Sequence, residues 1–297
     1  MLQFKPLAES DMDTVKPYLD QQQYRSCDYT VGGIYLWEKV FCPEYCIDKD
    51  MLFFKVKCPF RGLFFMFPVG FGDKIEALRS IAQYAASEQL PLMMTAVPLE
   101  ELFRIFQVFG ADIQIHRERD TADYLYAASD LSCFPGKKYH GQRNHAAFFA
   151  HTYGDYRYCT VTPEDIPALR RFLHLKYTVD EHAGTMEQAD FAISYNIIER
   201  FRYFGMQGGC LKNSQGDIAG FAFGERQGDT LYVHVEKADR NLRGAYQTIV
   251  QQFSAHMCTD EIRFINREDD AGDPGLRISK LSYHPVSLAE KYTVTVS

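Results

Sequence analysis

Apolar positions along the chain follow two periods, and together these predict a recurring series of strands and helices. "TLYVHVEKA" (230–238) alternates as a strand does, whereas Phe191, Tyr195, Ile198 and Phe201 recur at helical spacing. For the second half we predict the following order: strand 158–161, helix 163–178, helix 187–204, hairpin 206–223, strand 230–238, helix 242–257, strand 262–266, a short helix after Asp273 and a final strand to Val296.

The two halves begin with similar patterns. "FKPLAESDMDTVKPYL" (4–19) and "YCTVTPEDIPALRRFL" (158–173) align without a gap at a shift of 154 residues. Each predicts a strand, a capping region and an amphipathic helix, with Thr162 as N-cap, Pro163 at the first helical position and a capping-box pattern at Asp165. The same shift places 51–70 over 205–224, where both copies predict a hairpin. A duplication explains these matches.

The rest of the first half repeats the order loosely. It predicts helix 73–89, strand 91–97, helix 99–110 and strands 112–118 and 123–128, without a clear counterpart of 230–238. We therefore expect the first domain to be less suited to catalysis than the second. The order β-α-α-β-β-β-α-β-α-β is that of the acyl-CoA N-acyltransferase (GNAT) fold. We expect an α/β protein of two tandem GNAT-like domains, 1–135 and 136–297, each with a mixed central sheet flanked by helices.

Composition narrows the class of protein. The chain of 297 residues is 46% hydrophobic with a formal net charge of -7. Its first residues lack the apolar core of a signal peptide, and no stretch has the roughly 18 apolar residues of a spanning helix. Eight cysteines without a C-x-x-C pair predict reduced thiols, so we expect a soluble cytoplasmic protein. Cys42 and Cys46 have no second ligand pair at zinc spacing.

Positive charge gathers in one stretch of this acidic chain. "FPGKKYHGQRNHAAFF" (134–149) lies in a segment without carboxylates between Asp130 and Asp155, and the expected junction 136–153 contains it. Its cationic and polar side chains are suited to hold a phosphate or phosphodiester. The candidates are Lys137, Lys138, Arg143, Asn144 and His145. The alternative is a solvated loop leading into a helix with Asn144 as N-cap.

A second candidate is "FINREDDAGDPGLRISKLSYHP" (264–285). Its strand ends at Asn266, so Arg267 and Glu268 emerge at the carboxyl edge of the sheet, where open α/β folds bind ligands. A helix beginning at Pro274 would carry Arg277, Lys280 and His284 on one face. The alternative is an ion-pair network joining Arg277 to Asp270. The acidic residues lack the alternating ligands of a calcium loop, and we expect no metal.

The third candidate is 231–249. Strand alternation places His234 and Glu236 on one face, and a partly buried Glu236 is suited to act as a general base. Gly244 stands at a helix start beside Arg243, where free N–H groups can receive a phosphate. The segment matches the acyl-CoA pattern Gln/Arg-x-x-Gly-x-Gly/Ala poorly, because its one glycine falls one place late. A solvated helix start explains it as well.

These stretches together resemble a known family. "DYLYAASDLSCFPGKKYHGQRNHAAFF", "INREDDAGDPGLRISKLSYHP" and "VEKAD…GAYQTIVQQF" resemble bacterial proteins related to the C-terminal domain of phosphatidylglycerol lysyltransferase (DUF2156-like). The resemblance implies tandem GNAT-like domains in the wider group of Fem-type enzymes, which move an amino acid from aminoacyl-tRNA to amines of lipids or cell-wall precursors. The chain lacks the membrane region of the full-length lysyltransferase.

The resemblance implies a transferase and leads to a set of hypothetical roles. Glu236 or Glu268 would be the base, Asn266 with strand-edge amides would stabilise the oxyanion, and Tyr283 or Lys280 would be the acid. The basic stretch would bind the acceptor end of tRNA, with Arg243, Gly244, Arg267 and Arg277 as further donor-binding candidates. No Ser-His-Asp arrangement is recognisable.

Two other functions stay open at this point. One is an acyl-CoA-dependent N-acyltransferase, with acyl-CoA replacing aminoacyl-tRNA as the donor. The other is a non-catalytic ligand-binding protein on the same fold, because a fold alone does not establish a function. No resident cofactor is expected in either case; the acceptor would be a small molecule, a lipid or a cell-wall precursor.

Overall fold

The computed structural model describes residues 1–58, 61–177 and 185–296 and divides the chain into two compact units. The first unit comprises Met1–Asp123, Asp269–Asp273 and the residues from Leu288 onward. The second comprises Tyr124–Glu268 and Pro274–Ser287. This division differs from the expected domains 1–135 and 136–297, because each unit contains segments from both halves of the sequence.

The first unit is built around one mixed sheet. Its order is β1-β2-β3-β4-β6-β15-β7, with β5 paired to β3, and only β4 and β6 run parallel among the pairs described. The elements are β1 (Lys5–Pro6), α1 (Met12–Leu19), α2 (Val31–Tyr35), α3 (Glu38–Phe41), β2 (Glu44–Asp48), β3 (Met51–Cys58), β4 (Gly62–Met66), β5 (Val69–Gly70), α4 (Lys74–Ser87), β6 (Leu92–Pro98), α5 (Leu102–Phe109), β7 (Ile113–Arg117) and β15 (Lys291–Val296).

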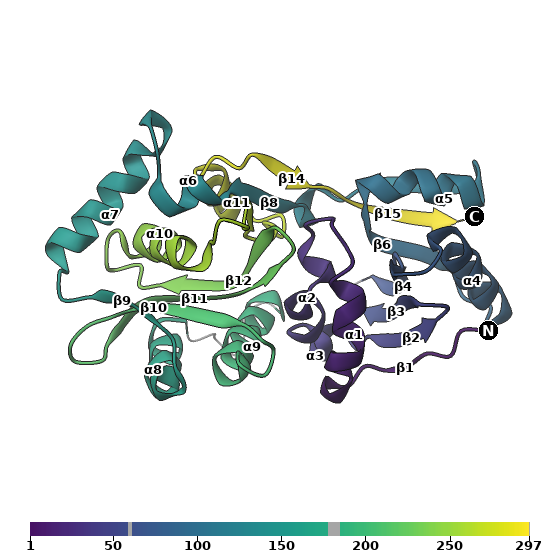
Figure 1. Ribbon diagram of the computed structural model, residues 1–297, viewed down its shortest axis with the longest axis horizontal. Coiled ribbons are helices and arrows are strands. Elements are labelled where there is room, and N and C mark those ends of the chain that lie inside the picture. The colour runs from purple at the N-terminus through teal and green to yellow at the C-terminus, as the bar shows by residue number, and fades with distance from the viewer. Residues whose placement is uncertain (59–60, 178–184, 297) are drawn as a thin grey trace. The chain divides into compact units, whose positions relative to one another are not determined.

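The second unit has its own mixed sheet, in the order β14-β8-β13-β12-β11-β10-β9. Helices α8 and α9 cover one face and α10 with α6 the other (Figure 1). The elements are β8 (Asp123–Ala127), α6 (Ala128–Cys133), α7 (His140–Thr152), β9 (Arg157–Thr160), α8 (Ile166–Tyr177), α9 (Thr185–Arg200), β10 (Gln207–Lys212), β11 (Ile218–Gln227), β12 (Thr230–Ala238), α10 (Ala245–Met257), β13 (Phe264–Asn266), α11 (Pro274–Leu281) and β14 (Ser287–Ala289).

The two sheets have the same topology. Position by position, β1 corresponds to β9, β4 to β12, β6 to β13 and β7 to β14, and in each sheet one parallel pair, β4 with β6 or β12 with β13, stands next to antiparallel neighbours. The prediction of two mixed α/β units of the tandem GNAT-like class is confirmed. The predicted elements are also found, except that residue 178, the end of the helix expected at 163–178, lies outside the described residues.

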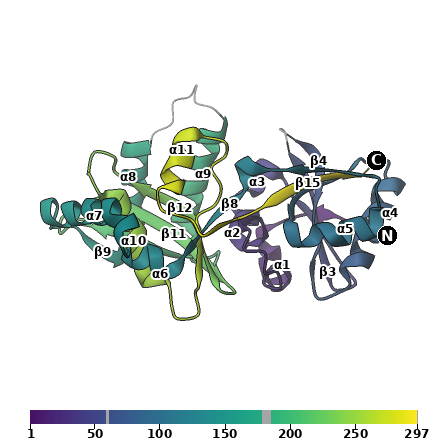
Figure 2. The same cartoon turned by 90° about the horizontal axis from the view of Figure 1, so that it is seen from above.

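The sixth strand of each sheet comes from the other half of the sequence. In the first sheet β15, from the C-terminal end of the chain, lies between β6 and β7; Figure 2 shows it running along the first unit. In the second sheet β8, from the middle of the chain, lies between β13 and β14. The two copies have therefore exchanged equivalent strands.

The start of the repeat is confirmed at atomic detail. Asp165 accepts the backbone N–H of Thr162 at 2.9 Å, and Asp11, its counterpart at the shift of 154, accepts the N–H of Ala8 at 3.0 Å. Beyond α1 the single shift fails by one strand, because the strand order equates β2 and β3, rather than β3 and β4, with β10 and β11. β4 is thus the counterpart of 230–238 that the sequence seemed to lack.

The turn between β11 and β12 and the core of the second unit follow ordinary residue preferences. A two-residue turn joins Gln227 to its partner Thr230, and Gly228 adopts φ 55°, the left-handed conformation such a turn requires. The faces of β11 and β12 supply Phe221, Phe223 and Leu231 to the second core, each fully buried. Among the described residues, no helix combines the length and apolar character needed to cross a bilayer.

Candidate functional site

The second sheet opens between β12 and β13. These parallel strands pair only from Thr230 to Tyr232 against Phe264 to Asn266; β13 then ends, while β12 continues to Ala238. The far part of β12 therefore has no strand partner on that side in the described chain. Ligands in open α/β sheets bind beyond the carboxyl ends of strands, so side chains on this part of β12 are well placed for function.

Glu236 lies on this part of β12 and forms an ion pair with Arg267, the first residue after β13. Arg267 Nη2 is 2.7 Å from Glu236 Oε1, and both side chains are only 12% exposed. The guanidinium carbon lies 4.6 Å from the centre of the Tyr283 ring and 5.6 Å from that of Tyr126. The structure thus brings together Glu236, Arg267 and Tyr283, which the sequence had named separately.

Protonation in this cluster is set by burial and by the ion pair. Burial opposes the charge of Arg267, but the Glu236 carboxylate outweighs it and raises the pKa, so the guanidinium stays charged. Burial raises the pKa of Tyr283, whose hydroxyl therefore stays protonated. Arg267 Nη1 is buried without a hydrogen-bond partner. A guanidinium N–H is thus left available to an incoming polar group, which protein interiors seldom allow.

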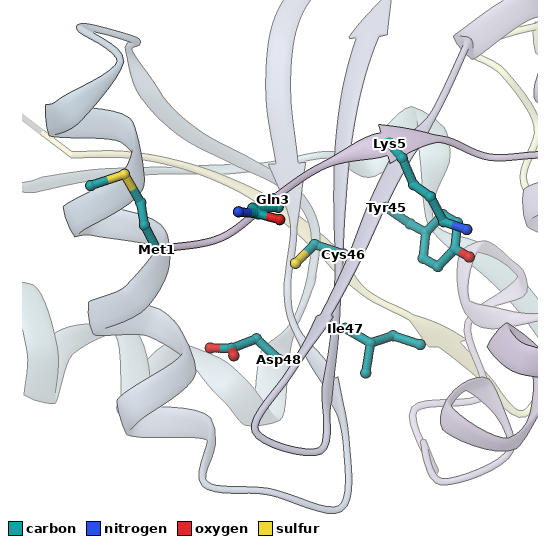
Figure 3. Close-up of a pocket in the computed structure, with 7 residues that line it drawn as sticks. All are labelled: Met1, Gln3, Lys5, Tyr45, Cys46, Ile47 and Asp48. Atoms are coloured by element: carbon teal, nitrogen blue, oxygen red, sulfur yellow. The ribbon is translucent and has the colours of Figure 1, made fainter.

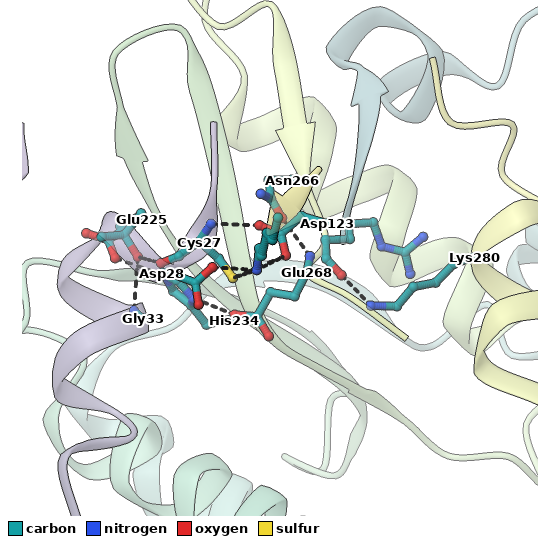
Figure 4. A network of polar contacts seen from close by, with 12 residues as sticks. Cys27, Asp28, Gly33, Asp123, Glu225, His234, Asn266, Glu268 and Lys280 are labelled. Atoms are coloured by element: carbon teal, nitrogen blue, oxygen red, sulfur yellow. Dashed lines mark hydrogen bonds and ion pairs between the residues drawn. The ribbon is translucent and has the colours of Figure 1, made fainter. Parts of the chain in front are cut away.

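His234 bridges two carboxylates beside this cluster (Figure 4). Its Nε2 lies 2.9 Å from Glu225 Oε1 on β11, and its Nδ1 lies 2.8 Å from Glu268 Oε1. The register of β11 and β12 slips between Phe223 and Gly224, which pairs them with Val235 and Val233 and leaves His234 as the extra residue of a β-bulge.

The His234 ring is held as an imidazolium. Burial by itself would lower its pKa, but the hydrogen bonds to Glu225 and Glu268 outweigh burial and raise the pKa to about 10. Glu268 itself is 25% exposed and adopts φ 55°, a strained conformation for a residue with a Cβ. The histidine therefore fixes one oxygen of a carboxylate that still reaches solvent.

Asn266 and Lys280 support the loop after β13. Asn266 is fully buried and its Oδ1 accepts the N–H of Glu268 at 2.6 Å. Lys280 is 9% exposed, and its Nζ donates to the carbonyl of Arg267 at 2.6 Å. The structure places both where they hold Arg267 and Glu268 in position, and their expected roles as oxyanion donor and acid stay predictions.

Part of the basic stretch has structural partners. Lys138 forms an ion pair with Asp130 at 2.7 Å, and Arg143 donates to the carbonyls of Phe134 and Gly136, the latter at 2.6 Å. Carbonyl groups leave the guanidinium charge uncompensated. Lys137 is exposed on the short 3-10 turn Lys137–Tyr139, so positive charge remains on this surface.

The helix in this stretch begins earlier than expected. α7 starts at His140, so Asn144 is not its N-cap; Asn144 Nδ2 lies inside the helix, 3.0 Å from His140 Nε2. The 3-10 turn continues directly into α7, which removes the need for a cap at Asn144. His145 is half-buried, with its carbonyl facing the start of α10.

The start of α10 is shaped by packing. Gly244 adopts φ 90°, and a Cβ there would lie 2.0 Å from the carbonyl oxygen of His145 on α7. The Ala245 N–H, an expected phosphate donor, binds the Leu242 carbonyl at 3.0 Å. These contacts contradict the expected phosphate site at Gly244. Arg243 is exposed, with its guanidinium 4.6 Å from the Phe148 ring centre, and Arg277 is half-buried on α11.

Sequence reasoning missed Glu225 and the role of His234. Alternation placed His234 and Glu236 on one face of the strand, and that was the available signal. Glu225 joins them only through the register of β11 with β12, in which the bulge displaces His234. Neither the bulge nor the register can be read from composition or spacing.

The first unit holds a different buried cluster. Lys291 Nζ is 2.7 Å from Asp123 Oδ1 and 2.5 Å from Asp28 Oδ2, and 3.6 Å from Cys27 Sγ. Cys27, Asp28 and Asp123 have the spacing of metal ligands, but the Lys291 ammonium already supplies the positive charge. β4, the counterpart of β12, carries the apolar Phe64, Phe65 and Met66 and so offers no equivalent of Glu236.

A groove of about 470 Å³ lies at the edge of the first sheet (Figure 3). It contains none of the predicted site residues, and we assign it no catalytic role. Its lining residues are Met1, Gln3, Lys5, Tyr45, Cys46, Ile47 and Asp48.

Known proteins are similar to this chain in sequence and fold. A solved structure of a conserved protein from Bacteroides thetaiotaomicron VPI-5482 is 32% identical, with a TM-score of 0.90 over 100% of both chains. The structure of L-PGS from Bacillus licheniformis shares the fold, with a TM-score of 0.65 and 14% identity over 96% of this chain and 91% of that one. A protein of Mycoplasmoides gallisepticum is 27% identical over 191 residues, which cover 62% of this chain and 59% of that relative's length.

The family model described as phosphatidylglycerol lysyltransferase, C-terminal, matches residues 20–295. This range covers most of both units and contains Glu236, Arg267 and Tyr283. The chain therefore belongs to the phosphatidylglycerol lysyltransferase C-terminal family, whose class of activity is acyl or aminoacyl transfer.

Proposed function

We propose that the second unit transfers an amino acid from aminoacyl-tRNA to an amine or hydroxyl of a lipid or cell-wall precursor. The observation that carries the proposal is the cluster of Glu236, Arg267 and Tyr283 beyond the end of β13. It combines a carboxylate, an unsatisfied guanidinium N–H and a protonated phenol, the groups an acyl transfer requires. Family membership supports the class of reaction.

The carboxylates act on the acceptor. In the proposed reaction Glu236 takes the proton of the attacking amine or hydroxyl, and Glu268 is the second candidate base. Only one oxygen of each takes part in the described contacts, Glu236 with Arg267 and Glu268 with His234. The other oxygen of each carboxylate is then available to the acceptor. The 25% exposure of Glu268 is compatible with this role.

Arg267 and Tyr283 act on the donor ester. The new bond forms between the acceptor and the acyl carbon, and negative charge collects on the carbonyl oxygen, toward which Arg267 Nη1 would donate. The bond from that carbon to the ribose oxygen then breaks, and the Tyr283 hydroxyl gives the departing oxygen its proton. The proton taken by the carboxylate restores the phenol, so protons balance over one turnover.

The basic stretch would hold the tRNA end. Lys137 and Arg143 keep positive charge that no carboxylate among the described residues compensates, and phosphates of a single-stranded acceptor end are suitable partners. Asn144, His145 and Arg243 lie on or beside the same helix and complete the proposed surface. Arg267, which the sequence had named as a donor-binding candidate, is paired with Glu236 and is assigned to the reacting centre in this proposal.

The alternative donor, acyl-CoA, is less well supported. Its pyrophosphate would need the start of α10, but α7 packs against Gly244 and the Ala245 N–H is already bonded. A non-catalytic binding protein on the same fold is the other alternative, and the transfer assay separates it from the enzyme.

The test is transfer of labelled amino acid from a bulk charged-tRNA pool to total lipid and cell-wall precursor fractions, with acetyl-CoA tested in parallel. We expect label in one fraction and at least about a hundredfold slower transfer by Glu236→Gln or Tyr283→Phe, within the usual range for acid-base groups. Tyr203→Phe, an exposed tyrosine in the same unit, is the matched control and should transfer normally.

Three outcomes decide between the functions. Label that stays on tRNA while acetyl-CoA is consumed favours the acyl-CoA enzyme. Inertness with every donor favours a binding protein. Full activity of Tyr283→Phe with the parent's pH profile contradicts the proposed acid role.

A further inference from the structure

Strand β7 (Ile113–Arg117) forms the outer edge of the first sheet. It pairs with β15 on one side, and no strand among the described residues pairs with its other side. Natural proteins usually protect an open edge with lysine, proline or a β-bulge. β7 contains neither lysine nor proline and pairs with β15 without a register shift. Its open edge is therefore suited to pair with a further strand.

The backbone groups on this open edge follow from the pairing with β15. Glu118 donates its N–H to the Lys291 carbonyl at 2.9 Å, and along an antiparallel pair the residues that bond the neighbouring strand alternate with residues that point away from it. Gln114 and His116 therefore point their backbone groups toward β15. The residues whose N–H and C=O point toward the open edge are Ile113, Ile115 and Arg117.

These three residues match an antiparallel copy of themselves. A second β7 centred on Ile115 places Ile115 opposite the partner's Ile115, and Ile113 opposite the partner's Arg117. Each outward N–H then faces an outward C=O along the whole strand. Such a pair has two-fold symmetry, so every favourable contact occurs twice, and most soluble oligomers are symmetric assemblies of one chain.

Charge does not oppose this pairing. Arg117 forms an ion pair with Glu290 of its own chain. Glu118, just past the strand, has its Oε2 3.4 Å from Arg61 Nη2. Asp112 would approach the partner's Glu118, whose charge Arg61 balances. The seam between two copies thus avoids the strong like-charge repulsion that keeps many edge strands apart.

Ile115 faces the same side of the sheet as the helices α4 and α5. It lies opposite Val294 of β15, which lies opposite Met94 of β6, so the three side chains share a face. Met94 in turn pairs with Phe65, whose ring centre is 6.2 Å from that of Tyr84 on α4. α5 packs against α4, and Figures 1 and 2 both show α5 beside β15. Ile115, which is 48% exposed, therefore lies on the side of the sheet that carries α5.

α5 adds exposed apolar side chains on this side of the sheet. Leu99, Phe103 and Phe106 recur at helical spacing and are 51%, 68% and 55% exposed. A two-fold axis perpendicular to the sheet would keep the α5 helices of two copies on one face of the joined sheet, near the seam. We call Leu99, Phe103, Phe106 and Ile115 the β7–α5 surface.

The size of the β7–α5 surface fits a dimer. With about 200 Å² for a phenylalanine side chain and slightly less for leucine and isoleucine, the exposed fractions give roughly 400 Å² of apolar surface in each copy. An interface of standard size buries about 800 Å² of each partner, and a little over half of that area is apolar. The four side chains thus supply most of the apolar area that a stable dimer needs.

We propose that two copies of this chain associate through the β7–α5 surface, with their β7 strands antiparallel and their first sheets joined into one. The strand hydrogen bonds set the register, and burial of the apolar side chains of Ile115 and α5 drives the association. All these residues belong to the first unit, for which we propose no catalytic role. The association therefore goes beyond the proposed function and requires no transfer reaction.

The experiment is sedimentation equilibrium of the full chain over a series of protein concentrations. We expect the parent to dimerise, and Ile115→Lys to weaken the dimer on the order of a hundredfold or more, because it places two ammonium groups face to face at the two-fold axis. Ile278→Lys makes the same change at a 70% exposed isoleucine on α11 of the second unit, and this matched control should associate like the parent. Thermal transitions measured where every protein is monomeric verify that the variants fold.

Amide hydrogen exchange at single-residue resolution tests the strand pairing itself. Gln114 and His116, whose backbone groups face β15, should be protected in the monomer and in the dimer. The amides whose exchange should slow at least about tenfold on dimerisation are those of Ile113, Ile115 and Arg117.

Removal of apolar side chains tests the part played by α5. Phe103→Ser/Phe106→Ser should weaken the dimer at least about tenfold, because large aromatic side chains usually dominate the affinity of an interface. Both residues are exposed, so the monomer should fold as the parent does. An unchanged dissociation constant would remove α5 from the interface.

A parent that sediments as a monomer throughout the concentration series would overturn the proposal. So would a dimer that persists in Ile115→Lys, or one lost equally in Ile278→Lys. Protection that does not alternate along β7 would contradict the antiparallel pairing. A monomeric parent that instead binds phosphatidylcholine vesicles through Phe103 and Phe106 would assign the surface to lipid. None of these measurements includes a donor or an acceptor, so a failed transfer assay leaves their results unaffected.

Discussion

Replacing Lys291 by Met should destabilise the first unit strongly. Lys291 is 3% exposed at the start of β15, and its ammonium faces Asp123, which is completely buried, and Asp28. Burial opposes the charge of the lysine, but the two carboxylates outweigh it and raise its pKa well above the usual value, so the ammonium is charged throughout the ordinary pH range. Met fills a similar volume and removes only the charge.

The size of the expected loss of stability follows from the Asp123 carboxylate, which Lys291→Met leaves without its partner. Asp123 would keep its hydrogen bond from the Cys27 N–H at 2.7 Å but, completely buried, would have no neutralising charge beside it. Removing one partner of a buried ion pair costs about 3–5 kcal/mol. At about 2–4 °C per kcal/mol for domains of this size, we expect the melting temperature to fall by roughly 6–20 °C.

The assay is urea unfolding of the parent and Lys291→Met at pH 7, where Lys291 of the parent is charged. Lys291→Met/Asp123→Asn should recover most of the stability, since the buried charge is removed together with its partner.

A loss below about 1 kcal/mol for Lys291→Met would refute the reasoning, because it would mean that the site solvates a lone carboxylate. A double variant less stable than the single one would show that Asp123 acts through its hydrogen bonds rather than its charge.

Two further outcomes test the second unit. Gly244→Ala should lower the free energy of unfolding by more than about 2 kcal/mol, because its Cβ would lie 2.0 Å from the His145 carbonyl oxygen. Gly141→Ala in α7, where a Cβ meets no atom within 4 Å, should raise it by roughly 0.5–1 kcal/mol. The opposite ranking in urea unfolding would contradict the packing. His234 has a folded pKa raised to about 10, so its stabilisation is complete below pH 6.5 and is lost as pH rises to 10, by at most about 1.4 kcal/mol per pH unit. His234→Gln should lack this alkaline loss, and an unchanged difference between the two proteins across pH 6.5–10 would count against the imidazolium.

Much of the fold could be predicted because periodicity reports local structure. The alternation of 230–238 and the helical spacing around Tyr195 each describe one element, and both are found. The sheet to which a strand belongs is a different matter. The residues of β8 and β15 have ordinary strand patterns, and nothing in their spacing indicates that each completes the sheet of the other half.

The sequence predicts single residues of the site, but not that these residues lie next to one another. Glu236 and Arg267 were named because each lies near the end of a predicted strand, and Tyr283 was named as a hypothetical acid in a stretch that resembles the family. Their meeting depends on the whole fold, because they lie on β12, after β13 and after α11. The sequence does not show that a 3-10 turn leads into α7 ahead of Asn144, which was the alternative N-cap. It also does not show that α7 packs against Gly244, which was expected to receive a phosphate.

The exchange of β8 and β15 sets an order on folding during synthesis. Domains usually fold as they leave the ribosome, N-terminal first. Here the first sheet lacks an interior strand until Lys291–Val296 emerges, long after its other strands have been synthesised. Until then β6 and β7 have unpaired edges that would otherwise be occupied by β15, and such edges invite pairing with other chains. The first sheet therefore stays incomplete while the whole sequence of the second sheet is synthesised.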